Sequence, residues 1–413
     1  MKNLFLISIM AFVSSSFAGG TKTQTAVTDP MPGLFRTQME ELVNINSGTN
    51  NPEGNQQIRE ILIRYFESLG FSSRVIEVPK LGDDTKKHHI LVFEMANSKP
   101  DILVLGHTDT VFEKFHPFQK MEDKGDIITG PGVVDMKGSI LLFYNALMNI
   151  PDKSKLAKFR IAFNDDEEIG STSTRGVLKE FADQSKYVLI IESPQQADVS
   201  TSHSGIIQKE VTVYGVEAHA GAAPLTGVNA CLENAMKTIK VYELNNYDSG
   251  LTFNSGIVRT YDAAKANTLC GEIKNIWDIR YINPSEFAGG QSRFEKIMKT
   301  HYAPNPSNKE IKETKIVDLN FTPALPIEKC QKLLDLFKSI AKEKLGVEVV
   351  SKHKGGVDAY GISDSNVEIL TGLGLQGDGM HSDKEFTNAN LFGRKINLLI
   401  VFLSQLSSNS SPE

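Results

Sequence analysis

The chain has 413 residues, of which 40% are hydrophobic, 23% charged and 8% aromatic. At about 150 residues per domain, this length predicts two to three domains with a large buried core. The composition excludes a disordered chain and a disulfide-rich scaffold, and the net charge of −6 argues against a nucleic-acid-binding protein.

The N-terminal segment has the features of a secretory signal peptide. Lys2 supplies a positive start, Leu4–Val13 is apolar, and Ser16 and Ala18 place small residues at the −3 and −1 positions of a cleavage site. A retained membrane anchor is the alternative, but the apolar run is shorter than the roughly 20 residues that span a bilayer. We expect cleavage after Ala18 and a mature protein that is secreted or periplasmic.

Helices and strands alternate after a polar leader at residues 19–33. Short apolar strands between helices predict an α/β fold with a mostly parallel sheet flanked by helices. The expected helices are Leu34–Leu42, Gln56–Leu69, Gly138–Leu147 and Thr174–Phe181, and the expected strands are Ser72–Val78, Ile90–Glu94, Asp101–Leu105, Phe159–Phe163 and Val188–Ile191.

The pattern changes near Ile207. The order of elements becomes strand, helix, strand, strand, helix, strand, which is a ferredoxin-like βαββαβ arrangement. We expect a signal peptide at 1–18, a larger domain split between 19–206 and 323–413, and an inserted domain at 207–322. The elements of the inserted domain are expected at Gln208–Tyr214, Gly227–Leu244, Leu251–Thr260, Thr268–Ile282, Ser285–His301 and Lys315–Phe321.

Three cysteines, Cys231, Cys270 and Cys330, form no close-spaced metal or redox motif. Their odd number leaves at least one free thiol. Buried unpaired thiols are the simpler interpretation, although an oxidising compartment permits one disulfide whose members the sequence does not identify.

Two groups of polar residues follow the first half of the expected sheet. The strand Asp101–Leu105 leads to His107, and Asp109 is placed to fix the imidazole by a hydrogen bond. The glycine-rich segment Gly130–Gly138 carries Asp135 at its tip, where a carboxylate can bridge two metal ions. A cap for the following helix is the simpler role for Asp135 taken alone.

Three more candidates follow later strands, as ligands do at the carboxyl ends of strands in open α/β sheets. The four adjacent carboxylates of Asp165–Glu168 repel one another. They form either a solvated acidic turn or a site where bound cations neutralise their charge. In the second case one of Glu167 and Glu168 binds metal while the other acts as a general base. Glu192 follows an apolar strand, and His381 lies in a glycine-rich turn.

Together these residues supply two histidines and three carboxylates at strand-to-loop junctions. Nitrogen and oxygen ligands without thiolate suit zinc, and also manganese or cobalt. Two such ions about 3.5–4 Å apart would polarise a carbonyl and activate a water molecule.

The motifs resemble those of the co-catalytic zinc metallopeptidases related to acetylornithine deacetylase, succinyl-diaminopimelate desuccinylase, aminoacylase and glutamate carboxypeptidase. The resemblance covers essentially the whole mature chain and is closest to the bacterial glutamate carboxypeptidase branch. It implies a zinc-peptidase-like catalytic domain with an inserted lid and dimerisation domain. The motifs are Gly-Pro-Gly before Asp135, Asn164–Ser171, Glu192-Ser-Pro, Ala218–Ala230, Gly355–Ala359 and His381-Ser-Asp-Lys.

The resemblance implies two zinc ions per chain. His107 and Glu192 resemble the ligands of one ion, Glu168 and His381 those of the other, and Asp135 the carboxylate that bridges them. Most relatives carry aspartate where this chain has Glu192, whereas the glutamate carboxypeptidase branch carries glutamate.

Two further roles carry over in the catalytic domain. Glu167 resembles the general base that acts on the water between the metals, and Asp109 resembles the residue that orients His107.

Four residues resemble the parts of the family that contact substrate. His219 resembles the histidine that stabilises the oxyanion, often from the partner subunit, and its alternative is a surface histidine in a turn. Asn267, Arg280 and Gly356 resemble positions near the substrate carboxylate. Arg280 has a strand-face salt bridge as its alternative, and Gly356 a simple turn. The resemblance also implies a homodimer formed through the inserted domain.

One departure bears on substrate choice. The glutamate carboxypeptidase pattern has an arginine shortly before Pro-Ala, and this chain reads Asn320-Phe-Thr-Pro-Ala324. We expect an exported carboxypeptidase that releases a C-terminal amino acid, glutamate first. An aminoacylase or dipeptidase that releases a neutral amino acid is the alternative. A non-catalytic peptide-binding or solute-binding protein is disfavoured because the full ligand set and Glu167 are present.

Overall fold

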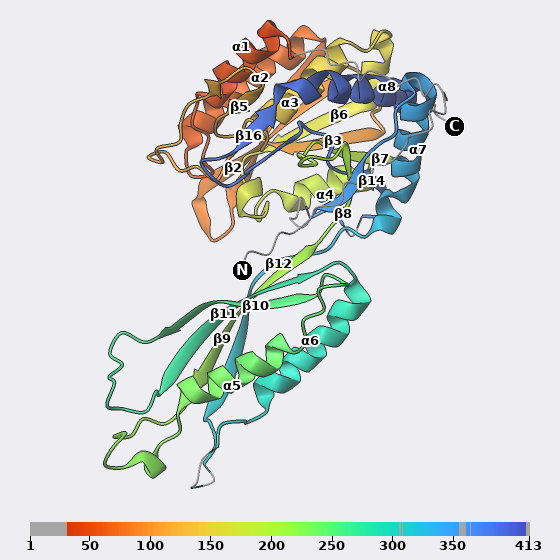
Figure 1. Cartoon of the computed structure of the whole chain (residues 1–413). Helices are drawn as coiled ribbons and strands as arrows, with labels where there is room; N and C mark the ends of the chain where they lie inside the picture. Colours follow the sequence, from red (N-terminus) through yellow and green to blue (C-terminus); the bar gives the residue numbers. More distant parts are fainter. Residues whose placement is uncertain (1–30, 305–306, 308, 355–360, 364, 410–413) are drawn as a thin grey trace, which may run out of the picture.

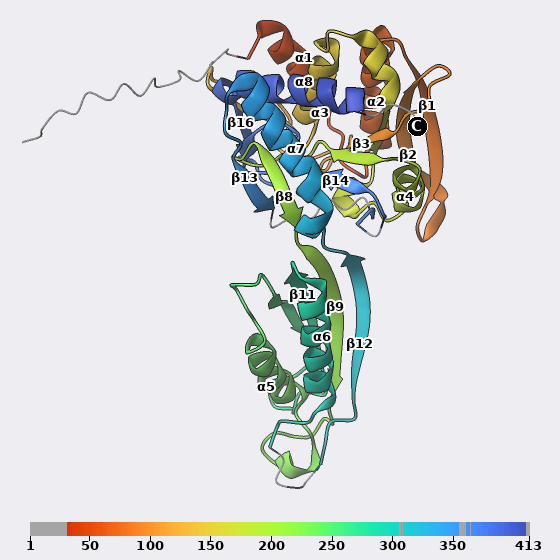
Figure 2. The ribbon, with the colours of Figure 1, turned by 90° about the vertical axis from the view of Figure 1, so that its right-hand side faces the viewer.

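The computed structural model describes residues 31–304, 307, 309–354, 361–363 and 365–409. The expected signal peptide and Gly356 lie outside these residues. The described chain forms a larger body and a smaller one, joined by a narrow neck at β9 (Gly205–Tyr214) and β12 (Glu313–Thr322) (Figures 1 and 2).

A six-stranded sheet lies at the centre of the larger body. Its strand order is β1–β2–β6–β3–β7–β14. The four strands from β6 to β14 run parallel, and β1 and β2 complete the sheet by antiparallel pairing. Every residue of β3 is buried, as in a parallel sheet covered on both faces. The bounds are β1 (Phe71–Lys80), β2 (Asp83–Met95), β3 (Ile102–His107), β6 (Phe159–Asn164), β7 (Tyr187–Ile190) and β14 (Glu368–Leu370).

Helices cover both faces of this sheet, which confirms the predicted α/β fold class. In Figure 1, α1, α2, α3 and α8 lie above the sheet, α4 lies below it, and α7 flanks the edge strand β14. No described helix combines the length and the apolar character needed to cross a membrane. The bounds are α1 (Gly33–Val43), α2 (Pro52–Ser68), α3 (Lys137–Met148), α4 (Arg175–Asp183), α7 (Ile327–Leu345) and α8 (Phe392–Asn409).

Short elements bring distant turns together beside the sheet. The small sheet β15–β16–β5–β4 pairs β16 with β5, so the turn between β15 and β16 lies next to the segment that follows β5. A second pair joins β8 to β13. The bounds are β4 (Glu122–Asp123), β5 (Ile127–Thr129), β8 (Val199–His203), β13 (Ser351–Lys354), β15 (Gly377–Asp378) and β16 (Phe386–Asn388), with 3-10 turns η1 (Lys153–Lys158), η2 (Glu167–Ile169), η3 (Pro224–Thr226) and η4 (Ala389–Leu391).

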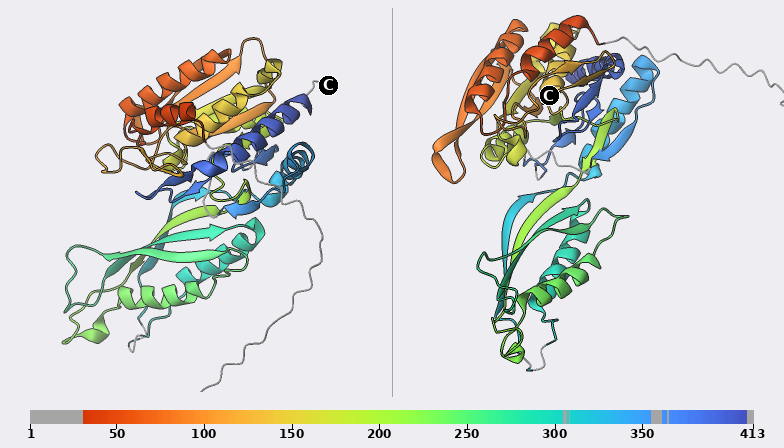
Figure 3. Two further views of the ribbon diagram at one scale, coloured as in Figure 1. Left: turned by 45° about the horizontal axis from the view of Figure 1, so that its top comes forward. Right: turned by 60° about the vertical axis from the view of Figure 1, so that its left-hand side comes forward.

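The smaller body, here called the inserted domain, is a four-stranded antiparallel sheet of order β10–β11–β9–β12. Helices α5 and α6 cover one face and leave the other open (Figure 3). Its own core contains Trp277, whose ring lies edge-on to Phe294 with the centroids 5.6 Å apart. The element order is the expected βαββαβ, with α5 (Ala230–Tyr242), β10 (Thr252–Thr260), β11 (Glu272–Tyr281) and α6 (Pro284–Lys299).

Two of the three cysteines form a disulfide. Cys231 and Cys270 are bonded with their Cα atoms 5.6 Å apart, while Cys330 is a buried free thiol. The expectation of buried unpaired thiols is therefore wrong for two positions. The reason is local: the N–H of Ala230 donates to the carbonyl of Cys270 at 2.8 Å, which brings the start of α5 against the segment before β11.

Candidate metal centre

The predicted ligands meet at one edge of the central sheet. His107 ends β3, Glu167 and Glu168 lie in the turn after β6, and Glu192 follows β7. These three strands are parallel neighbours, so their carboxyl ends lie side by side. The prediction that residues far apart in sequence gather at strand ends therefore holds for this part of the cluster.

His107 is completely buried and is held on both ring nitrogens. Its Nδ1 lies 3.0 Å from the backbone oxygen of Asp109 and 3.3 Å from Asp109 Oδ1. Its Nε2 lies 3.1 Å from Asp135 Oδ1 and 3.3 Å from Glu192 Oε1. Burial lowers the pKa of His107, but the charge of Glu192 and the hydrogen bonds raise it well above its ordinary value.

The second half of the cluster is built on His381. Its Nε2 lies 3.3 Å from Asp135 Oδ2 and 3.2 Å from Glu168 Oε2. The two oxygens of Asp135 thus face different histidines, Oδ1 toward His107 and Oδ2 toward His381. A carboxylate placed in this way has the geometry of a bridge between two neighbouring sites.

A buried carboxylate that the sequence did not reveal supports the Asp135 turn. Glu385 Oε1 accepts hydrogen bonds from the N–H groups of Val134 and Asp135 at 2.9 and 3.0 Å, and Oε2 accepts one from Gly132 at 3.0 Å. Burial and the charge of Asp135 raise the pKa of Glu385 to about 8, against the effect of these three donors. Its only sequence signal is a charged residue four positions after His381, which is weak.

Asp109 does more than orient His107. Its Oδ1 and Oδ2 accept hydrogen bonds from the backbone N–H groups of Glu167 and Glu168, both at 3.2 Å. Thr49 Oγ1 donates to Oδ2 at 2.7 Å. Asp109 therefore links the end of β3 to the turn that carries the two glutamates.

The donor set fits divalent metal ions. One ligand atom from each of His107, Asp135 and Glu168 lies within 4.8 Å of the others, and the same holds for His107, Glu167 and Glu192. Burial and the charge of Asp135 raise the pKa of Glu168, as expected where buried carboxylates lie close together. Imidazole and carboxylate donors without thiolate suit zinc and similar ions.

The candidates of the inserted domain lie at two different ends of it. Arg280 stands opposite Ile206 near the neck, and its guanidinium forks onto Asp278 at 2.6 and 3.1 Å. The strand-face salt bridge that was the alternative for Arg280 is therefore present in this structure. Gly356 lies outside the described residues.

His219 and Asn267 lie together at the opposite end of the inserted domain, beyond Tyr214 of β9, where His219 bridges to Thr268. This end of the inserted domain points away from the larger body (Figures 1 and 2). The N–H of Ala220 donates to the carbonyl of Asn267 at 2.9 Å. His219 Nδ1 accepts from the N–H groups of Gly221 and Ala222, and both predicted residues are exposed. The described chain therefore does not bring them to the candidate ligand cluster.

Comparison with known proteins places this architecture in a family. A model of peptidase family M20/M25/M40 matches residues 103–405, which include the whole ligand cluster. The chain belongs to this family. The resemblance stated from the motifs is thereby confirmed, and so is the coarser functional expectation of a metallopeptidase-type hydrolase.

Individual relatives agree with membership of family M20/M25/M40. The chain is similar to carboxypeptidase G2 from Pseudomonas sp. (strain RS-16), with 28% identity over 410 residues that cover 94% of this chain and 95% of that protein. It is also similar to acetylornithine deacetylase from Vibrio campbellii, with 26% identity over 63% of this chain and 70% of that protein.

Solved structures share the fold over nearly their full length. Aminopeptidase PepT from Bacillus cereus aligns with a TM-score of 0.70 and 18% identity, covering 90% of this chain and 98% of that one. The M20 family metallo-carboxypeptidase Sso-CP2 from Sulfolobus solfataricus aligns with a TM-score of 0.67 and 16% identity, covering 92% of this chain and 100% of that one.

Proposed function

We propose that this M20/M25/M40 family member is an exported zinc carboxypeptidase that hydrolyses an amide or peptide bond and releases a C-terminal glutamate. The observation that carries the proposal is the position of Asp135, whose two oxygens face His107 and His381 separately. The similarity to carboxypeptidase G2 along almost the whole chain supports a carboxypeptidase over other hydrolases.

The ligand cluster divides into two halves around Asp135. His107 and Glu192 would hold one zinc ion, and Glu168 and His381 would hold the other. When bound, the two ions would polarise the scissile carbonyl and lower the pKa of a water molecule. Cobalt or manganese would fit the same donors.

Glu167 is the proposed general base. It is buried beside His107 and Glu192, and its backbone N–H is fixed by Asp109. Its carboxylate would accept a proton from the attacking water and pass that proton to the leaving amine. His219 would stabilise the negative charge that develops on the carbonyl oxygen.

Arg280 is proposed to bind the carboxylate of the leaving amino acid. Asn267 lies with His219 at the other end of the inserted domain, so its proposed contact with that carboxylate would come from a partner subunit. The proposed contact of Gly356 comes from the resemblance alone. A guanidinium binds a carboxylate through two parallel hydrogen bonds, which is how Arg280 now binds Asp278. A substrate carboxylate would replace Asp278 as the partner in the same geometry.

Release of a neutral amino acid is the second candidate, because of one substitution. Thr322 is buried at the end of β12 where the glutamate carboxypeptidase pattern has an arginine nearby. A site without that guanidinium has less charge to select a glutamate side chain. An aminoacylase or dipeptidase would keep the same ligands and the same role for Glu167.

A homodimer through the inserted domain is supported by the surface of that domain. Strand β10 is an open edge of its sheet, and Ile257 and Val258 on it are each 52% exposed. On α5, Leu232 and Ile239 are 42% and 65% exposed. Open edges and exposed apolar side chains of this kind are typical of protein interfaces.

Export is supported by the N-terminal sequence and by the disulfide. Disulfides persist in oxidising compartments such as the periplasm and the extracellular space. The Cys231–Cys270 bond fits a mature protein located there.

The test is a release assay with the zinc-loaded protein on a panel of peptides and N-acyl amino acids. We expect glutamate release that is abolished by a chelator, restored by zinc and lost in Glu167→Gln. Release of a neutral amino acid instead would move the enzyme to the aminoacylase or dipeptidase group. No release from any substrate would refute the catalytic proposal.

A further inference from the structure

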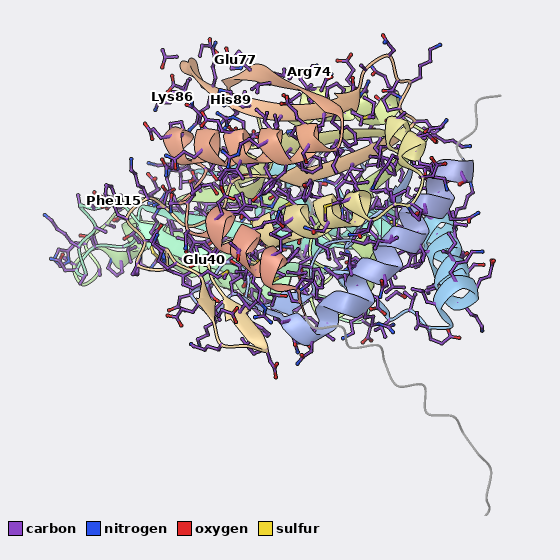
Figure 4. All side chains as sticks on the ribbon, turned by 90° about the horizontal axis from the view of Figure 1, so that it is seen from above. Glu40, Arg74, Glu77, Lys86, His89 and Phe115 are labelled. Carbon is purple, nitrogen blue, oxygen red and sulfur yellow. A yellow bond between two sulfur atoms is a disulfide. The ribbon has the colours of Figure 1, made fainter. Side chains whose placement is uncertain are left out.

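The end of the inserted domain that carries His219 is made of two loops, here together called the tip. The first loop, residues 215–229, connects β9 to α5, and the second loop, residues 261–271, connects β10 to β11. Both loops extend past the larger body, on the side where Figure 4 labels Phe115 (Figures 1 and 4). A second subunit can therefore approach the tip.

Backbone hydrogen bonds join the two loops on either side of His219. The N–H of Leu269 donates to the carbonyl of Ala218 at 2.8 Å, and the bond from Ala220 to the second loop lies on the other side. His219 itself stands opposite Thr268 in an isolated antiparallel bridge. The position of His219 therefore depends on how the second loop is held against the first.

The turn after His219 determines which ring nitrogen can donate a hydrogen bond. Nδ1 accepts from the N–H groups of Gly221 and Ala222, at 3.2 and 3.0 Å. A neutral imidazole that accepts at Nδ1 carries its proton on Nε2. The Nε2–H group is then the donor that a developing oxyanion needs, provided that the tip keeps it in place.

Apolar packing supports the tip only at its base. Most residues of both loops are exposed, and the side chain of Leu225 is 52% exposed. Cys231 and Cys270 are half-buried and pack against the core of the inserted domain. Segments with solvent-exposed backbone hydrogen bonds and few buried apolar contacts open easily. Packing alone therefore leaves His219 in a segment of low local stability.

The disulfide joins the two loops at this base. Cys231 is the second residue of α5, directly after the first loop, and Cys270 follows Thr268 by two residues in the second loop. The bond prevents the loops from separating, because a disulfide keeps its two Cα atoms within about 7 Å of each other. A short tether lowers the entropic cost of closing the loops again, so the hydrogen bonds beside His219 re-form readily after each opening.

We propose that Cys231 and Cys270 are positioning residues, whose disulfide holds His219 and Asn267 in place to act in the active site of the partner subunit. The inference rests on the proposed hydrolase function and on a dimer formed through the inserted domain. An oxyanion donor is effective only if it is already held at the correct distance, and a displacement of about 1 Å can cost about 100-fold in rate. The disulfide therefore contributes to the rate of the reaction as well as to stability.

The first experiment measures kcat for amino acid release by the zinc-loaded protein with and without the disulfide. We expect Cys231→Ser/Cys270→Ser to lower kcat about tenfold. The same two substitutions should have little further effect in His219→Ala, because the donor that the disulfide positions is already absent. Ala264→Ser, at an exposed position of the second loop, is the matched control and should keep the wild-type kcat.

The second experiment follows the tip itself and does not depend on activity. Hydrogen–deuterium exchange is measured by mass spectrometry on peptides that contain the amides of Ala220 and Leu269. We expect these amides to exchange about tenfold faster in the double serine variant, with no change in peptides from β3. A protein that hydrolyses no substrate would refute the proposed function, whereas the exchange result would still test the positioning of the tip.

Two controls separate the tip from the rest of the inserted domain. Trp277 is the only tryptophan in the sequence and lies in the core of this domain, so unchanged fluorescence shows that the core is intact. If the emission shifts in the serine variant, Cys231→Val/Cys270→Ala takes its place, because it keeps apolar atoms at both half-buried positions. Light scattering checks the dimer, since Leu232 beside Cys231 is one of the exposed apolar residues of the proposed interface.

Two results would overturn the proposal while the core and the dimer remain intact. One is equal hydrogen exchange in the tip with and without the disulfide. The other is an equal loss of kcat in the presence and in the absence of the His219 side chain. A variant with an intact core that no longer dimerises would also overturn the proposal, because the bond would then support the interface instead of the tip.

Discussion

The position of His219 leads to a prediction about subunits. Ile206, opposite Arg280, and Tyr214 at the far end of β9 are eight residues apart, which is about 27 Å along a strand. His219 lies beyond Tyr214, so a rigid inserted domain cannot present both His219 and Arg280 to one cluster. We expect His219 to serve the active site of the partner subunit.

The perturbation is a pair of variants that are inactive for different reasons. Glu167→Gln removes the proposed base, and His219→Ala removes an oxyanion donor at a cost of about 100-fold or more in rate. In a mixed dimer, one site combines an intact Glu167 with an intact His219, and the other site lacks both. Random exchange of equal amounts makes half of the dimers mixed, so the mixture should show about a quarter of the wild-type rate.

The assay follows amino acid release after the two variants are co-expressed with different tags or exchanged at mild denaturant concentration. Mixed dimers purified through both tags should reach about half the wild-type rate. The matched control mixes Glu167→Gln with Glu192→Gln, which places both lesions in the catalytic domain and should recover nothing. If the mixture of Glu167→Gln and His219→Ala releases amino acid no faster than the separate variants, His219 does not act across the interface.

Three further predictions concern individual contacts. Replacing Cys231 and Cys270 with serine opens a loop with a sequence separation of 39 and should lower the free energy of unfolding by about 4 kcal/mol in urea titrations; an unchanged midpoint would mean that the bond adds nothing. Burial raises the pKa of Asp165, but hydrogen bonds with His88 and His89 outweigh this effect and lower the pKa to about 2. Because the pKa of Asp165 is lower in the folded than in the unfolded protein, the ionised carboxylate stabilises the fold, and this contribution is complete above about pH 4. It falls by about 2.5 kcal/mol toward pH 2. In Asp165→Asn, the free energy of unfolding should lose this dependence on pH. Arg280→Lys should raise KM about tenfold with little change in kcat, since lysine cannot form the bidentate contact; an unchanged KM would exclude Arg280 from substrate binding.

Much of the site was predictable because its residues follow buried strands. The apolar runs before His107, Glu167 and Glu192 fix where each strand ends, and parallel pairing then brings those ends together. Asp135 and His381 come from glycine-rich turns outside the six-stranded sheet. Their approach depends on the small sheet that joins β5 to β16, whose strands are too short to leave a periodic pattern.

The residues that the sequence did not reveal are those whose partners lie far away in the chain. Glu385 contacts Gly132 and Asp135 across about 250 positions, and nothing near it marks it as buried. Asp165 looks like its acidic neighbours in sequence, yet its partners are Arg59 and two histidines of the hairpin.

The early part of β2 was missed for a different reason. Residues 83–89 extend beyond the pairing with β6, so their side chains lack the alternation that a buried face imposes.

The chain passes through the neck twice, in β9 and again in β12, and this affects how the protein folds. The sheet is completed only when β14 pairs with β7, across about 180 residues that include the inserted domain. Because Thr322 pairs with Ile206, prior folding of the inserted domain ties the ends of its segment together and shortens the loop left to close. A threefold shorter loop lowers the entropic cost of closure by about 1 kcal/mol. During synthesis, the inserted domain has a separate core and can fold first. It then holds the two segments of the larger domain close together, so that their strands can pair.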